Sequence, residues 1–203
     1  MKNYKEIKAC RVCENTNLTD VLSLGVLYVS DFSDQQNSDN GIKAPLDLVL
    51  CNSETGGCGL LQLKHTVSNE SMYRNYWYRS GINKTMRDEL SSISSKAKSM
   101  IDLKSGDYVI DIGANDGTLL RSYSLDGLNT VGFEPALNLE KYGVQGTTKI
   151  IVDFFNFSQW NKNFNNNKAK VITAIGMFYD LDDPNSFVSD VEKCMDDEGA
   201  LYD

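Results

Sequence analysis

A strand-like run that ends in an acid and a glycine-bounded turn constrains the fold of this chain more than any other feature. The run is Val109-Ile-Asp-Ile-Gly-Ala-Asn-Asp-Gly-Thr-Leu-Leu120. Its apolar first part is typical of a buried strand, and the turn from Gly113 to Gly117 leads into a helix predicted to begin near Thr118. In doubly wound α/β folds, a turn of this kind at the carboxyl end of the first strand is where ligands bind.

Similar apolar, β-branched runs recur along the second half of the chain, separated by polar or helical segments. The predicted strands are Tyr108–Ile112, Thr130–Phe133, Lys149–Val152 and Lys170–Ile175, with Gly199–Asp203 as the start of a fifth. Strands that alternate with helices favour a parallel sheet with right-handed crossovers. The asparagine-rich segment Asn161–Asn167 is predicted to be a surface loop. The fold class is therefore α/β.

The composition of the first turn indicates what it binds. A dinucleotide site favours G-x-G-x-x-G, whereas here three residues separate Gly113 from Gly117, and Asn115 and Asp116 replace the second glycine. An acid at this turn would repel a pyrophosphate, but it suits a ligand with an ammonium and a sulfonium, such as S-adenosylmethionine. We therefore expect Asp111 and the turn to hold the methionine part of that cofactor.

The second predicted strand ends in Val131-Gly-Phe-Glu134-Pro135. Glu134 lies 21 residues after Gly113, where an acid can accept hydrogen bonds from both ribose hydroxyls. We expect Glu134, with Pro135 beside it, to bind the ribose.

The third and fourth strands end in residues that suit the remaining parts of the cofactor. Asp153 could accept from the adenine amine, and Phe154 and Phe155 could stack on its faces, while Gly176 and Met177 could pack around the methionine part. The alternative is that each acid only caps a helix. The coordinated set at one sheet edge favours a cofactor site.

Four of the five cysteines fall in two close pairs within the first 60 residues. Cys10 and Cys13 form a C-x2-C pair, and Cys51 and Cys58 form a C-x6-C pair. Two such pairs can complete the tetrahedral four-sulfur site that Zn2+ accepts. Because a closed four-cysteine site has no open position, the zinc is expected to be structural. Buried cysteines without a ligand remain the alternative.

Other cysteine and histidine positions carry less information. Gly56 and Gly57 could supply the backbone freedom that the longer x6 spacing needs. Cys194 is left over and is predicted to be a core residue. The lone histidine, His65, is interpreted as a hydrogen-bonded structural residue, with a ligand or catalytic role as the alternative.

Three zones follow from these patterns. Residues 1–80 read as a small β-rich zinc module with strands at Leu46–Leu50 and Gly59–Leu63, and residues 106–203 read as a Rossmann-like domain. Between them, residues 81–105 are expected to form a connecting helix over Ile82–Leu103, stopped at Gly106. Its apolar face recurs at helical spacing over Met86, Leu90, Ile93, Ala97, Met100 and Leu103.

Charge and hydropathy exclude some partners. The chain has 20 basic and 28 acidic residues and a net charge of −8, which argues against nucleic acid as a partner. No apolar stretch approaches the roughly 20 residues that span a bilayer. The N-terminus lacks the apolar region of a secretory signal. We therefore expect a cytoplasmic protein without a membrane or nucleic-acid partner.

Taken together, the motifs resemble class I S-adenosylmethionine-dependent methyltransferases that carry an N-terminal zinc module and C-methylate nucleotide-linked keto-deoxysugars. The resemblance covers essentially all 203 residues. It rests on the two cysteine pairs and on Tyr76-Trp-Tyr-Arg-Ser-Gly-Ile-Asn83, Asp111–Leu120, Gly132-Phe-Glu-Pro135, Asp153-Phe-Phe155 and Met177-Phe-Tyr-Asp-Leu-Asp-Asp-Pro184. It implies that Tyr78 and Ser80 contact the cofactor. An aromatic plug between the modules is the alternative for Tyr76–Tyr78.

The resemblance also implies a reaction and a missing part. In such enzymes a base removes the proton beside a 4-keto group, and the resulting enolate carbon takes the methyl group. Relatives continue past this point with a histidine-containing stretch and a second α/β domain for the nucleotide-sugar. The catalytic base is therefore unknown here, and the methyltransferase sheet is expected to be incomplete. The alternatives are a non-catalytic truncated cofactor-binding protein and a nicotinamide-dependent oxidoreductase.

Overall fold

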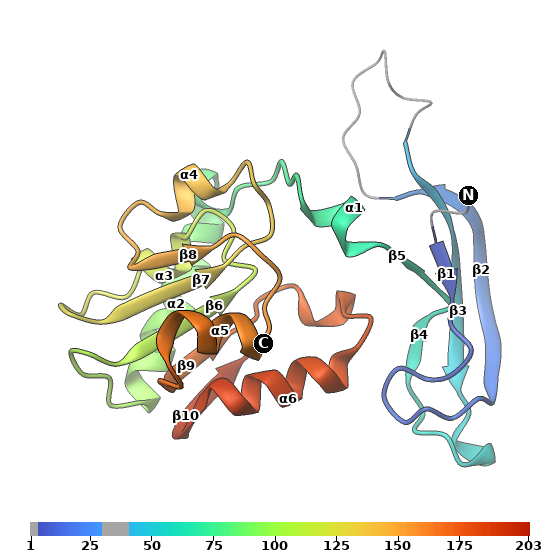
Figure 1. The fold of residues 1–203 in the computed structure, drawn as a ribbon. Helices are drawn as coiled ribbons and strands as arrows, with labels where there is room; N and C mark the ends of the chain where they lie inside the picture. The colour runs from blue at the N-terminus through green and yellow to red at the C-terminus, as the bar shows by residue number, and fades with distance from the viewer. Residues whose placement is uncertain (1–3, 30–40) are drawn as a thin grey trace. The chain divides into compact units, whose positions relative to one another are not determined.

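A computed structural model describes residues 4–29 and 41–203 of the chain. The described chain divides into two compact units (Figure 1). The first runs to Arg74 and includes Asp182–Asn185, and the second comprises Asn75–Leu181 and Ser186–Asp203. The division separates the region of the four paired cysteines from the region of the predicted parallel sheet.

The first unit is built from short antiparallel pairings. Its elements are β1 (Tyr4–Glu6), β2 (Leu18–Tyr28), β3 (Lys43–Cys51), β4 (Leu61–Leu63), β5 (His65–Val67) and α1 (Asn69–Tyr73). β2, β3 and β4 form an antiparallel sheet in that order, and β1 pairs with β5. The predicted strand Leu46–Leu50 lies within β3. β4 begins two residues later than predicted, because Gly59 adopts a left-handed backbone with φ of 82°. The β-rich module is confirmed.

The second unit contains a five-stranded, fully parallel sheet in the order β10-β9-β6-β7-β8. Its elements are α2 (Lys84–Met100), β6 (Tyr108–Ile112), α3 (Thr118–Arg121), β7 (Asn129–Phe133), α4 (Glu140–Gly143), β8 (Lys149–Ile151), α5 (Phe157–Phe164), β9 (Ala169–Thr173), α6 (Pro184–Cys194) and β10 (Met195–Tyr202). Each predicted strand matches an observed one to within a few residues. The α/β class is confirmed.

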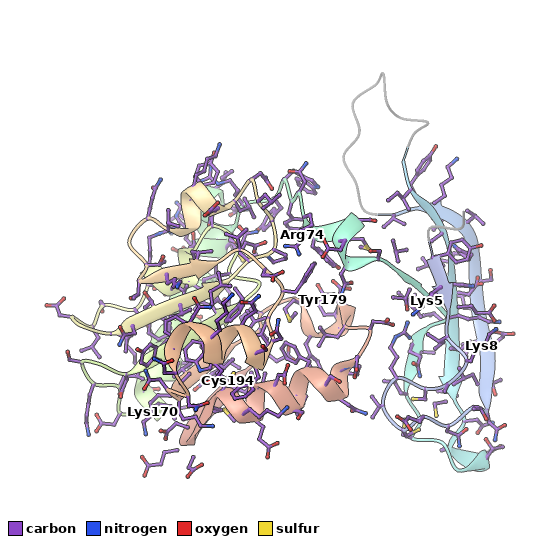
Figure 2. The ribbon with its side chains drawn as sticks, viewed as in Figure 1. Lys5, Lys8, Arg74, Lys170, Tyr179 and Cys194 are labelled. Carbon is purple, nitrogen blue, oxygen red and sulfur yellow. The ribbon has the colours of Figure 1, made fainter. Side chains whose placement is uncertain are left out.

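Alternation along the strands sends side chains to two separate cores. In β6, Val109 packs in one cluster with residues of α2 and α3, whereas Ile110 and Ile112 pack in the other with residues of α5 and α6. Figure 1 shows these two helix pairs on opposite sides of the sheet. Cys194, labelled in Figure 2, ends α6 and is fully buried, as predicted. Both faces of the sheet are therefore covered, as parallel sheets require.

The predicted connecting helix is shorter than expected and belongs to the core of the second unit. Asn83 caps its start by accepting a hydrogen bond from the Thr85 backbone, and the chain becomes extended at Ile101, so Gly106 is not its stop. Leu90 and Ala97 are buried against α3 and β6, but two other members of the predicted face, Met86 and Met100, are exposed. No helix among the described residues is long and apolar enough to cross a membrane.

The prediction of a surface loop at Asn161–Asn167 is wrong in its first half. Residues up to Phe164 complete α5, and Asn165 ends the helix in the left-handed conformation that asparagine tolerates. Trp160 is fully buried, and its indole donates a hydrogen bond to the Asn167 carbonyl at 2.7 Å. The helix was not predicted here because Trp160 and Phe164, one turn apart, are its only apolar side chains after Phe157, and the residues between them are polar.

We expect Gly132→Ala to destabilise the second unit. A Cβ at Gly132 would lie 2.6 Å from Ile150 Cδ1 and 2.7 Å from Ala114 Cβ. Overpacking of this kind lowers the free energy of unfolding by about 1–3 kcal/mol. Urea denaturation followed by Trp160 fluorescence, in a Trp77→Phe background, measures it. Ser99→Ala on the exposed face of α2 is the control, and an unchanged midpoint for Gly132→Ala would contradict the packing described.

Candidate functional site

The four paired cysteines converge on one point of the first unit. The sulfurs of Cys10 and Cys58 lie 3.6 Å apart, those of Cys13 and Cys51 lie 3.5 Å apart, and all four lie within 4.8 Å of one another. A tetrahedron with zinc–sulfur bonds of about 2.3 Å has sulfur–sulfur edges of about 3.8 Å. The donor set and its spacing therefore fit a structural Zn2+ site.

Backbone geometry around the second pair explains how a C-x6-C spacing reaches this point. Gly56 has a left-handed backbone with φ of 82°. A Cβ on Gly57 would lie 2.6 Å from the Cys51 sulfur and 2.6 Å from the Asn52 carbonyl, so only glycine fits there. The Cys58 backbone N–H donates to the Cys51 sulfur at 3.4 Å. The two glycines thus fold the intervening residues tightly enough for both sulfurs to point inward.

The surroundings of the sulfurs separate their acidities. Burial raises the pKa of the Cys10 thiol, but hydrogen bonds from the Cys13 and Val12 backbones and from the Gln62 amide outweigh it and lower the pKa to about 6. Burial, with the neighbouring sulfurs, raises the pKa of Cys51 to about 12. Thiolates in contact oppose one another's ionisation, and a divalent cation among them would relieve that repulsion.

His65 lies outside the cysteine cluster. Its Nδ1 is 3.6 Å from an Asp47 carboxylate oxygen, beyond hydrogen-bond distance, and its ring packs edge-on against Tyr4. Nδ1 has no hydrogen-bond partner. The side chain is therefore part of the packing between β5 and its neighbours, which agrees with a structural rather than a metal-binding histidine.

The second candidate site lies where the parallel sheet reverses its order. From β6 the chain adds β7 and β8 on one side and then β9 and β10 on the other, so the carboxyl ends of β6 and β9 flank the switch point. The loop after β6 turns sharply, with left-handed backbones at Gly113, Asn115 and Gly117. Met177, after β9, packs over Gly113, and the space beside Gly176 is open. The expected residues from strands one and four are therefore neighbours.

Glu134 joins this loop to the end of β7. Its Oε2 accepts a hydrogen bond from the Asn115 backbone at 2.7 Å, and its Oε1 accepts one from the Ala136 backbone at 2.8 Å. The side chain is 5% exposed, and burial raises the pKa of its carboxyl. Each oxygen keeps a lone pair for a further donor. Pro135 follows and is half-buried.

Asp111 is more deeply engaged than expected. Its Oδ1 accepts a hydrogen bond from the Thr173 hydroxyl of β9 at 2.6 Å. Burial raises the pKa of this carboxyl to about 7. The side chain lies within β6, on the same side of the sheet as Val109. It is buried there, in the strand itself and not in the loop that follows.

The side chains of Asn115 and Asp116 reach a segment that precedes α2. Asn115 donates to the Tyr78 carbonyl at 3.1 Å and accepts from the Ser80 backbone at 3.0 Å. Asp116 accepts from the Gly81 backbone at 3.0 Å. Tyr78 and Ser80 are thereby held at the loop after β6, and their contact with the cofactor remains what the resemblance implies.

Arg79 is a residue of this region that the sequence patterns did not single out. Its guanidinium carbon lies 3.6 Å from the centre of the Tyr142 ring, and its Nε lies 3.6 Å from an Asp116 oxygen. Nothing in the local sequence signals these contacts, because both partners are distant along the chain.

Of the residues after β8, Asp153 accepts local hydrogen bonds and Phe155 packs in the core. Asp153 accepts hydrogen bonds from the Phe154 backbone at 2.9 Å and from the Gln159 amide at 3.2 Å. Phe155 packs edge-on against Phe133, with ring centres 5.0 Å apart, and belongs to the core. Of the two predicted aromatics, only Phe154 is not part of that core cluster.

Two known families match the chain. The family described as "Putative zinc binding domain" matches residues 10–73, which include all four clustered cysteines. The family described as "Methyltransferase domain" matches residues 78–202. The curated protein "C-methyltransferase NovU" of Streptomyces niveus is 27% identical over 137 residues, which are 66% of this chain and 32% of that protein. The chain thus spans about a third of that relative's length.

Solved structures show more distant similarity. A SAM-dependent methyltransferase from Thiobacillus denitrificans, in complex with S-adenosyl-L-homocysteine, is 15% identical, with a TM-score of 0.42 over 56% of this chain and 46% of that one. The cyclopropane synthase MmaA2 from Mycobacterium tuberculosis is 18% identical, with a TM-score of 0.45 over 66% of this chain and 51% of that one.

The matched methyltransferase domain covers more than half of the chain, and it encloses the parallel sheet, the loop after β6 and Glu134. The chain therefore belongs to the methyltransferase domain family.

Proposed function

We propose that this chain is the zinc- and cofactor-binding part of an S-adenosylmethionine-dependent C-methyltransferase. The observation that carries the proposal is the placement of Glu134 beside the glycine-bounded loop at the switch point, within a methyltransferase family domain. The family match and the C-methyltransferase relative favour this function over a nicotinamide-dependent oxidoreductase.

The residues at the sheet edge fit the parts of this cofactor. When bound, S-adenosylmethionine supplies a methyl group on a positively charged sulfur. Glu134 would accept hydrogen bonds from the ribose hydroxyls with its remaining lone pairs. Asp153 would accept from the adenine amine, with Phe154 against the ring. Gly113 and Gly176 would leave room for the methionine part, and Met177 would pack against it.

The substrate we propose is a nucleotide-linked 4-keto-deoxysugar. The support is the combined resemblance of the zinc pairs, the tyrosine-rich segment and the Met177–Pro184 motif, together with the C-methyltransferase named above. The sugar would be held by a further domain that lies outside these residues, and that domain would supply the base. This chain's part would be to bind and orient the methyl donor.

The zinc would act as a folding element of the first unit. Among its described residues, the buried apolar side chains are those of Cys10, Ala44, Val49 and Cys51, and two of these four are cysteines of the cluster. Such a core is too small to be stable alone, whereas structural zinc contributes about 10–16 kcal/mol in zinc-finger peptides.

We expect one zinc per chain, lost in Cys58→Ser. Metal content measured by mass spectrometry should fall from one equivalent to near zero, and protease cleavage of the first unit should accelerate. Cys194→Ala removes a cysteine outside the cluster and is the matched control, which should keep its zinc. Full metal content in Cys58→Ser would contradict the four-sulfur site.

We expect Glu134→Ala to weaken binding of S-adenosylhomocysteine without loss of zinc. Hydrogen bonds to a charged group contribute about 1.5–3 kcal/mol each, so the dissociation constant should rise by at least about tenfold. Calorimetry measures it, Glu134→Gln tests the charge alone, and Glu140→Ala on exposed surface is the control. Equal affinity in Glu134→Ala would refute the ribose assignment.

The raised pKa of Asp111 predicts a pH-dependent stability. The folded chain holds this proton to about pH 7, against 3.8 for the free side chain. The free energy of unfolding should therefore decrease as pH rises from about 4 to about 7, because the unfolded chain releases the proton first. In Asp111→Asn the free energy of unfolding should not show this decrease between about pH 4 and about pH 7. If urea denaturation gave the same pH dependence for the variant and the wild type, Asp111 would not be the group responsible.

A further inference from the structure

We propose that Asn115 and Asp116 are positioning residues, which hold the segment Tyr76–Ile82 against the loop after β6 and affect cofactor affinity through that segment. We call this segment the strap. The inference rests on the proposed function and revises it at one point: these two side chains do not contact the cofactor themselves.

Backbone groups take three of the four hydrogen-bonding positions of the Asn115 amide. Its Nδ2 donates to the Tyr78 carbonyl at 3.1 Å, and its Oδ1 accepts from the backbones of Ser80 at 3.0 Å and Asp116 at 2.9 Å. An amide oxygen has two lone pairs, so it has no acceptor capacity left for a ligand. The side chain reaches the strap from a residue whose backbone is left-handed, with φ of 52°.

The Asp116 carboxylate is also engaged within the protein. It accepts from the Gly81 backbone at 3.0 Å and from the Thr118 hydroxyl at 2.6 Å. Its side chain is 1% exposed and lies 3.6 Å from the Arg79 Nε and 3.8 Å from an Arg121 nitrogen. Two guanidinium groups therefore lie close to the buried Asp116 carboxylate. A ligand's sulfonium or ammonium group would have to displace them to contact it.

The strap approaches this carboxylate as closely as a backbone can. A Cβ on Gly81 would lie 2.6 Å from the Thr118 hydroxyl oxygen and 2.8 Å from Asp116 Oδ2. Glycine at position 81 is thus a requirement of the contact. Replacement by alanine would displace the strap while both loop side chains stay intact.

Further contacts fix the N-terminal half of the strap to residues that follow β7. The Tyr76 backbone donates to Asn138 Oδ1 at 3.0 Å, and Asn138 Nδ2 donates back to the Tyr76 carbonyl at 2.8 Å. Arg79 stacks on Tyr142. The strap is therefore bound at several points along its length, and Asn115 and Asp116 supply those nearest the switch point.

Asn115 also connects the strap to the proposed ribose acid. Its side chain holds Tyr78 and Ser80, while its backbone N–H donates to Glu134 at 2.7 Å. A shift of this one residue would move both the strap and the donor that orients Glu134. The strap and the cofactor acid thus share a single loop residue, which gives the proposed coupling a physical path.

The first test measures the strap without any ligand. In Asn115→Ala, hydrogen exchange at the Ser80 amide should accelerate by about fivefold or more, as expected for loss of a hydrogen bond of about 1 kcal/mol or more. Acrylamide quenching gives a second readout, since Trp77 in the strap is 47% exposed and Trp160 is fully buried. Ser99→Ala is the control. Unchanged exchange and quenching would overturn the proposal.

The second test separates action through the strap from direct contact. Asn115→Ala should weaken S-adenosylhomocysteine binding by about tenfold or more in the wild-type background. In a Gly81→Ala background, where the strap is already displaced, the same substitution should have an effect of less than about twofold, because interacting sites are not additive. Equal losses in the two backgrounds would show direct contact and overturn the proposal.

Failure of the proposed function would look different. If the wild-type chain bound no S-adenosylhomocysteine while Asn115→Ala still released the strap amides, the cofactor assignment would fall and the positioning role in the fold would stand. If the chain bound S-adenosylhomocysteine but Asn115→Ala left the strap amides protected, the cofactor assignment would stand and the positioning role would fall.

Discussion

The attachment of the loop after β6 to the end of β7 is the constraint on which the methyltransferase site depends. The backbones of Gly113 and Ala114 both donate to the Phe133 carbonyl, at 2.9 and 3.0 Å, and Asn115 donates to Glu134. These bonds let the chain leave β6 and turn at once, with Gly113 in a left-handed conformation. Everything proposed for the cofactor starts from the resulting juxtaposition.

The two units are stabilised in different ways. The second unit buries two apolar clusters on the faces of a parallel sheet and so has a core of ordinary size. The first unit has few buried apolar side chains among its described residues, and its four sulfurs form the centre instead. A metal there replaces the hydrophobic burial that short antiparallel strands cannot supply.

Local pattern predicted the strands well and the polar helices poorly. β6 lies at the predicted Tyr108–Ile112, because a buried parallel strand is a continuous apolar run. The C-terminal half of α5 was missed because asparagines cover its outer face, while Phe157, Trp160 and Phe164 pack inward. α2 ended before its apolar periodicity did, since Met100 is exposed and the chain turns away at Ile101.

The sequence by itself determined the element order, the four-cysteine set and the acids at the strand ends, because spacing and periodicity are local properties of the chain. Only the tertiary structure decided which hydrogen-bond partners these side chains have within the protein. Asn115 and Asp116 were predicted as cofactor residues from the turn alone, and the structure shows that each also accepts a hydrogen bond from a strap backbone 35 positions away in sequence. Such partners are set by packing between distant segments, which no local pattern encodes.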